Sequence, residues 1–98
     1  MIDKSRLKSL TKRADTLKAL AHPSRLLIIE ELVKKECCVN ELTEMIGAEM
    51  PTISNHLKIL RNAGYIDKEK RGTQVYYFLI RDCVKIVLEC LDNACALK

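Results

Sequence analysis

The sequence predicts a mainly α-helical domain with one β-hairpin. Apolar residues recur at helical spacing in several separate segments, and two short runs of strand-forming residues flank a single turn. The length of 98 residues suffices for one compact domain and not for two. We therefore expect one domain over residues 1–98, with five helices and a two-stranded hairpin.

The first third of the chain predicts two helices. Leucine and alanine recur every three or four residues within residues 3–20, with lysine and arginine between them, which indicates an amphipathic helix. His22 and Pro23 then interrupt the chain and restart it, since proline suits a first helical turn and His22 suits a cap or packing position. Residues 26–33 are apolar on most sides, which makes the second helix the expected core helix.

The middle of the chain predicts a helix-turn-helix. After an extended link, Asn40 is a suitable N-cap for a short helix over residues 41–46, and Gly47 is suited to end it. Pro51 suits the first turn of the next helix, at about residues 50–62, whose apolar positions Ile53, Leu57 and Leu60 are expected to face inward. Two short helices about four residues apart are typical of this motif.

The last third predicts the hairpin, at about residues 65–80, and a final helix at about residues 82–96 with Asp82 as its N-cap. A helix-turn-helix followed directly by a hairpin is the plan of a winged helix. The apolar stripes of the helices at 3–20 and 82–96 have little else in a small domain to pack against. We therefore expect a symmetric homodimer built from these two helices.

Charge and polar residues nominate double-stranded DNA as the partner. Residues 48–81 carry six basic and three acidic residues, although a solvated surface alone could explain so modest an excess. The expected DNA-contacting side chains can donate and accept hydrogen bonds at base edges and phosphates. On the helix at 50–62 they are Thr52, Ser54, Asn55, His56, Lys58 and Arg61, and on the hairpin Lys68, Lys70, Arg71 and Gln74.

The composition also excludes several classes of protein. No apolar stretch approaches the ~20 residues needed to span a bilayer, and no signal peptide is recognisable, so we expect a cytoplasmic protein without membrane contact. No nucleophile and base set, paired carboxylates or glycine-rich phosphate loop is present, so we expect no enzyme and no required cofactor.

Five cysteines, an odd number, argue against a disulfide framework in a reducing compartment. Cys37 and Cys38 are adjacent, follow Lys34 and Lys35, which could favour their thiolates, and are the first candidates for a sensor. The competing candidates are Cys83, Cys90 and Cys95 on the final helix. Thiolates without histidine favour As(III), cadmium or another thiophilic ion, with a reversible disulfide or persulfide as the other option. All of these cysteines could equally be small core residues.

Three strings resemble the ArsR/SmtB family of repressors. They are Ala21-His22-Pro23-Ser24-Arg25-Leu26, the run from Pro51 to Gly64 (PTISNHLKILRNAG), and Arg71-Gly72-Thr73-Gln74-Val75-Tyr76-Tyr77. The resemblance implies a homodimer, operator binding without ligand, and release when an inducer binds. Zinc- and nickel-sensing members use histidine and carboxylate ligands on the final helix, where this chain has no histidine. Arsenic-responsive members carry Cys-Val-Cys-Asp-Leu-Cys, which Cys38-Val39-Asn40-Glu41-Leu42-Thr43 resembles with two thiols replaced.

The sequence therefore predicts a transcriptional repressor that a thiol-reactive inducer, namely arsenite, a soft metal ion, an oxidant or a persulfide, releases from its operator. Two alternatives stay open: a winged-helix DNA binder without an inducer, and a protein-interaction module with structural cysteines.

Overall fold

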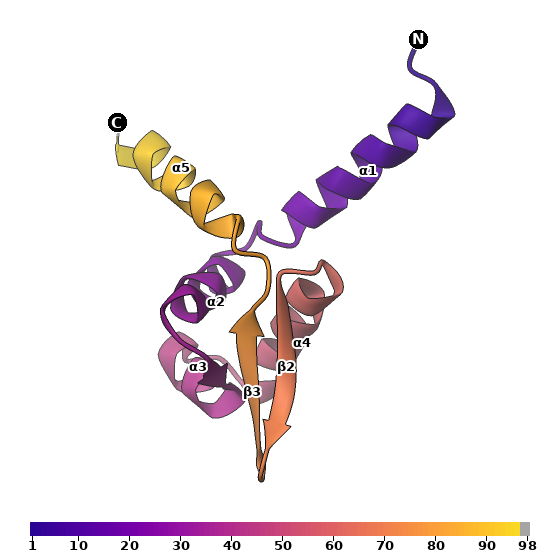
Figure 1. Cartoon of the computed structure of the whole chain (residues 1–98). Coiled ribbons are helices and arrows are strands. Elements are labelled where there is room, and N and C mark those ends of the chain that lie inside the picture. Colours follow the sequence, from indigo (N-terminus) through magenta and orange to yellow (C-terminus); the bar gives the residue numbers. More distant parts are fainter. Residues whose placement is uncertain (97–98) are drawn as a thin grey trace.

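The computed structural model describes residues 1–96, so the last two positions of the predicted domain, 97 and 98, lie outside the described residues. Within this range the chain forms five helices and three short antiparallel strands (Figure 1). In chain order the elements are α1 (Lys4–Lys18), α2 (Pro23–Lys34), β1 (Cys37–Cys38), α3 (Val39–Ile46), α4 (Met50–Asn62), β2 (Ile66–Arg71), β3 (Gln74–Leu79) and α5 (Val84–Ala96).

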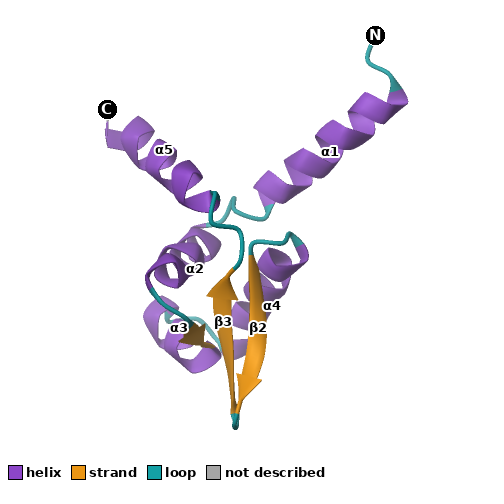
Figure 2. Cartoon of the chain, viewed as in Figure 1, coloured by secondary structure: helices purple, strands orange, loops and turns teal. Residues whose placement is uncertain are grey.

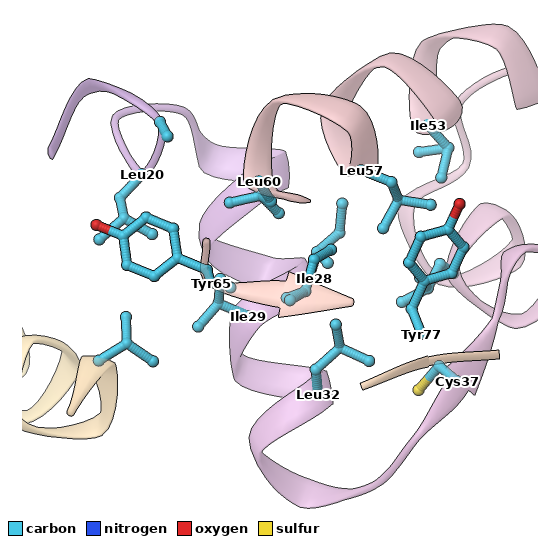
Figure 3. Packing of buried hydrophobic residues seen from close by; sticks show 14 residues of the cluster. Leu20, Ile28, Ile29, Leu32, Cys37, Ile53, Leu57, Leu60, Tyr65 and Tyr77 are labelled. Atoms are coloured by element: carbon cyan, nitrogen blue, oxygen red, sulfur yellow. The ribbon is translucent and has the colours of Figure 1, made fainter. Parts of the chain in front are cut away.

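The core lies between α2, α4 and the sheet (Figure 3). Ile28 and Ile29 of α2 and Leu57 of α4 are completely buried, as is Ile66 at the start of β2. The expected inward face of α4 is confirmed, because Ile53 and Leu60 are buried as well. These contacts fix the orientation of α4, so the opposite side of the helix, with Thr52, Ser54, Asn55 and Lys58, is exposed.

The predicted hairpin is confirmed, and the predicted extended link before it forms a third strand of the sheet. β2 and β3 pair along six positions from Ile66↔Leu79 to Arg71↔Gln74. β1 pairs with the other edge of β3, so the strand order is β1-β3-β2. The adjacent cysteines Cys37 and Cys38 therefore lie in the same sheet as the hairpin.

Two predicted helix caps are wrong. Helix α3 begins one residue before Asn40, because Cys38 ends β1 in an extended conformation and its N–H donates to Oε1 of Glu41 at 3.2 Å. Helix α5 begins at Val84, and Asp82 lies in the turn before it, where its backbone carbonyl accepts from the N–H of Lys85. The predicted ends at His22 and Gly47 are confirmed: His22 Nδ1 accepts from the N–H of Ser24 at 3.0 Å, and Gly47 has a φ of 75°.

Helices α1 and α5 project from the end of the body opposite the hairpin tip (Figure 2). No residue of α1 is buried, and large apolar side chains are exposed on both helices, among them Leu7, Leu17, Ile86 and Leu91. The hydroxyl of Tyr65 donates to the Thr16 carbonyl at 2.9 Å and ties the end of α1 to the body. None of the helices described over residues 1–96 is long and apolar enough to cross a membrane.

Candidate nucleic-acid interface

Helix α4 presents a row of polar side chains to solvent. Thr52, Ser54, Asn55 and Lys58 are all exposed, as expected, because the buried residues on the opposite side of the helix hold it in one orientation. Hydroxyl, amide and ammonium groups in one row can donate and accept hydrogen bonds at base edges and phosphates.

The prediction that His56 faces outward is wrong. Its side chain is buried, with 7% exposed, and its ring centroid lies 4.5 Å from that of His22. Nη1 of Arg25 lies 3.4 Å from Nδ1 of His56. Burial, then His22 and Arg25, lower the pKa of His56, so the neutral imidazole is favoured. His56 is therefore a packing residue between α2 and α4.

A hollow of about 400 Å³ separates α4 from the hairpin. Lys58 and Arg61 of α4 line one side, and Lys68 and Tyr77 of the strands line the other. Three cationic side chains around one recess suit a backbone phosphate, which accepts hydrogen bonds and carries negative charge. Tyr77 is also a buried core residue, with 8% of its surface exposed, so the floor of the hollow is part of the core.

The two arginines of the predicted interface already have carboxylate partners. Nε of Arg61 lies 2.9 Å from Oδ1 of Asp67, and the backbone N–H of Lys68, followed by this contact with Arg61, lowers the pKa of Asp67. Arg71 contacts Glu36 at 2.6 Å and also Glu69, and both carboxylates raise the pKa of Arg71 further. Within residues 1–96, Lys58, Lys68 and Lys70 form no ion pair, and exposed Gln74 lies beside the hairpin tip. Glu69 and Arg71 are two residues apart on one strand and share a face of the sheet, so their contact could be predicted from the sequence. The contact with Glu36 could not, because Glu36 comes from a separate segment.

Cys37 and Cys38 are buried, with 0% and 6% of their surface exposed. Burial, followed by Glu41, raises the pKa of Cys37, which outweighs the opposing effect of Lys35. The prediction that the neighbouring lysines favour a thiolate at Cys37 is therefore wrong, and Lys35 instead contacts Glu41 at 3.0 Å. Successive residues of a strand point to opposite faces of the sheet, so these two thiols do not converge on one ion in this conformation.

Cys83, Cys90 and Cys95 are exposed, and Cys83 lies just before α5 rather than in its first turn. No group of three or more histidine, cysteine or acidic residues in the described part of the chain is arranged to hold a metal ion. The five cysteines thus divide into a buried pair beside the hairpin and an exposed trio at the other end of the molecule.

A helix-turn-helix whose second helix turns polar side chains outward beside a basic hairpin defines a winged-helix transcription regulator. Residues 22–68 match the family model described as bacterial regulatory protein, arsR family. The chain belongs to this family, the ArsR/SmtB repressors that its sequence resembles.

Three similar proteins illustrate the relationship. An uncharacterized HTH-type transcriptional regulator of Methanocaldococcus jannaschii is 35% identical over 83 residues, which cover 84% of this chain and 93% of the relative. The arsenical resistance operon repressor of Bacillus subtilis is 40% identical over 80% of this chain and 75% of its own length. The crystal structure of NolR from Sinorhizobium fredii superposes with a TM-score of 0.88 at 29% identity, covering 96% and 94% of the two chains. Regulators rather than enzymes are thus its relatives, as expected.

Proposed function

We propose that the chain acts as a homodimer on double-stranded operator DNA, with α4 in the major groove and the β2–β3 hairpin against the neighbouring backbone or minor groove. The observation that carries this proposal is the exposed polar row of α4 beside the basic hollow formed with the hairpin. The dimer contact would use the exposed apolar side chains of two helices, Leu7, Leu10 and Leu17 on α1 and Ile86 and Leu91 on α5. A two-fold dimer suits an operator with half-sites about 34 Å apart.

Within this interface, Thr52, Ser54 and Asn55 are proposed to read bases, and Lys58, Lys68 and Lys70 to contact phosphates. Arg61, Arg71 and Gln74 are proposed to help, although each arginine would first have to leave a carboxylate. Three free lysines per subunit give six phosphate contacts per dimer, for which the slope of log affinity against log salt is roughly −5. A slope near −1 would contradict a phosphate-binding role for these lysines.

The test begins with selection of bound fragments from genomic DNA, followed by fluorescence anisotropy on the selected site and on random DNA. Asn55→Ala is expected to cost about 1 to 3 kcal/mol on the selected site and little on random DNA. Lys58→Ala should weaken both alike. Asn93→Ala, an exposed asparagine on α5, is the matched control. Equal loss on both DNAs for Asn55→Ala would remove it from the base-reading group.

We further propose that a thiol-reactive inducer releases the operator, and that it acts first on Cys83, Cys90 and Cys95. Their exposure supports this choice over Cys37 and Cys38, since a reagent or a thiophilic ion such as As(III) or cadmium can reach them. Cys90 and Cys95 lie on the proposed dimer helix α5 and Cys83 lies just before it, so their modification could re-orient the subunits. Cys37 and Cys38 stay the second candidate, because β1 pairs directly with the hairpin.

Two variants separate the candidates: Cys83, Cys90 and Cys95 replaced together by serine, and Cys37 and Cys38 replaced together by serine. The panel is arsenite, cadmium and a mild oxidant, with arsenite first because the Bacillus subtilis relative is named an arsenical resistance operon repressor. We expect the triple variant to bind operator and resist release. Release that is lost only in the double variant would transfer the role to the buried pair, and release by none of the panel would favour a DNA binder without this kind of inducer.

A further inference from the structure

A second hollow, of about 660 Å³, lies between α1, α2 and the end of α4. It is away from the polar row of α4, because it touches that helix only at its last turn, at Ile59, Asn62 and Ala63. Neither the proposed DNA contacts nor the cysteines take part in it. Its volume falls in the range of small-molecule sites, about 300 to 1,000 Å³.

The walls of this hollow are strongly cationic. Lys12 and Lys18 come from α1, Arg25 from α2 and Arg81 from the segment after β3, whereas Asp15 is the single acidic residue in the lining. Asp15 lies 3.8 Å from Lys18, and the other three cations have no carboxylate within ion-pair distance in the part of the chain that the structure describes. Three uncompensated positive charges around one recess favour an anionic occupant.

Both arginines contact groups other than carboxylates. Arg25 lies against His56, with Nη1 at 3.4 Å from Nδ1 of the imidazole. Nε of Arg81 donates to the Gly64 carbonyl at 3.3 Å, and its guanidinium carbon lies 5.4 Å from the ring centroid of Tyr65. Gly64 has a φ of 83°, and a Cβ there would come within 2.8 Å of Nη2 of Arg81, so the glycine leaves room for the guanidinium. Nε of Arg25 is buried and has no hydrogen-bond partner among residues 1–96. A guanidinium offers paired donors that match a carboxylate or a phosphate.

The rest of the lining is partly apolar, with Ala19, Ile59 and Ala63 beside the cations. The hollow also faces away from the expected dimer contact. On an ideal helix the lining positions Lys12, Asp15, Thr16 and Ala19 lie roughly 120° to 180° from the centre of the apolar stripe of α1, whereas Lys18 lies about 60° from it. Dimerisation through that stripe therefore leaves the side of the hollow formed by those four positions open to solvent.

We propose that this hollow binds a small organic anion, in which a carboxylate or phosphate monoester group contacts Arg25, Arg81 and Lys12 and an apolar group lies against Ile59 and the two alanines. The site is independent of operator binding. Because Arg25 also lies against His56, an occupant contacts a side chain that packs directly on α4.

The experiment is a titration of the free dimer, without DNA, followed by amide chemical shifts and by calorimetry. The probes are benzoate and phenyl phosphate, with benzyl alcohol as the uncharged counterpart and inorganic phosphate as the anion without an apolar group. We expect saturable shifts at Ala19, Asn62 and Ala63 with the two aromatic anions. Inorganic phosphate should bind more weakly, and benzyl alcohol should not saturate. Absence of saturable shifts with both aromatic anions overturns the proposal.

Charge variants localise the binding. Lys12→Gln together with Arg81→Gln should lower the affinity for the tighter-binding aromatic anion at least about tenfold. This is the size expected for loss of one charge-assisted hydrogen bond. Lys8→Gln together with Arg13→Gln removes the same charge from exposed positions of α1 outside the hollow and should leave affinity within about twofold. Equal weakening by both pairs would show only non-specific attraction and overturn the site.

A further pair of variants covers the case in which Arg81→Gln disturbs the fold. Lys12→Gln alone changes an exposed side chain, and Arg81→Lys keeps the charge but removes the paired donors. Each variant should still lower the affinity for the anion several-fold, while its amide spectrum stays that of the folded dimer. If Arg81→Gln instead dissociates the dimer, the partner subunit contacts the hollow and the proposal is wrong. Because no DNA is present, a failure of operator binding would not affect any of these results.

Discussion

Helices α4 and α1 have similar apolar repeats in the sequence, yet they use them differently. In α4 the repeat is completely buried within the chain, at Ile53, Leu57 and Leu60. In α1 the leucines remain open, with Leu7 and Leu17 exposed by 53% and 59%. Helical periodicity therefore identifies a face that is to be covered, but it does not say whether the same chain or a second copy covers it.

The largest effect is expected for Leu57→Ala in α4. Removing a fully buried leucine leaves a cavity and should lower the free energy of unfolding by about 2 to 5 kcal/mol. Leu17→Ala is the matched change in α1 and should cost less than about 0.5 kcal/mol at protein concentrations below the dissociation constant of the proposed dimer. Urea unfolding measures both. Equal losses would mean that α1 packs on its own body and would break the comparison.

The next largest effect concerns association. Leu7→Lys together with Leu17→Lys places charges on the exposed stripe of α1 and should raise the dissociation constant of the dimer at least about 30-fold, or about 2 kcal/mol. Sedimentation velocity over a concentration series measures the shift. Ser5→Lys with Ser9→Lys adds the same charge to the other side of α1 as a control. A dimer that tolerates the leucine changes would place its contact elsewhere.

His56 sharpens the contrast, because it is the polar residue on the buried side of α4. Its lowered pKa means that the unfolded chain takes up a proton more readily than the folded chain below about pH 6.5. The free energy of unfolding is therefore unaffected by His56 above that pH. It decreases as the pH falls toward the lowered pKa of His56 in the folded chain. Urea unfolding at pH 7.0 and pH 5.5 should show a drop that is absent in His56→Gln. Glu41 and Asp67, whose pKa values are also lowered, act only below about pH 4.5, outside this window.

The smallest effect is expected where α1 joins the body. Tyr65→Phe removes the hydrogen bond to the Thr16 carbonyl and should cost about 1 kcal/mol, with faster amide exchange at the end of α1. Tyr76→Phe is a suitable control, since its ring stacks with Arg71 but its hydroxyl has no hydrogen bond among the described residues. Unchanged exchange in Tyr65→Phe would show that other contacts hold this end of the helix.

Regular elements with several turns or paired positions were predictable, because their periodicity repeats. The exposed side chains Thr52, Ser54, Asn55 and Lys58 follow from the same repeat. The prediction for His56 is wrong because it follows residue type rather than position. His56 comes three residues after Ile53 and four before Leu60, and positions with that spacing share a helix face.

Features that join distant segments were not predictable. β1 has two residues, too few for any periodicity, and its partners Tyr76 and Tyr77 lie far along the chain. The burial of Cys37 and Cys38 follows from that pairing and not from their residue type. For the same reason the sequence does not reveal that Glu36 holds Arg71. Long-range contacts of this kind depend on the completed fold.

The position of β1 at the edge of the sheet also has a consequence for timing. A strand of two residues at an edge can detach with less free energy than global unfolding requires. A thiol reagent would then label Cys37 and Cys38 only during such openings, at a rate set by the opening equilibrium. Labelling of Cys83, Cys90 and Cys95 needs no opening and should be complete first. The rate of the slower labelling phase would therefore measure local opening of the sheet at β1.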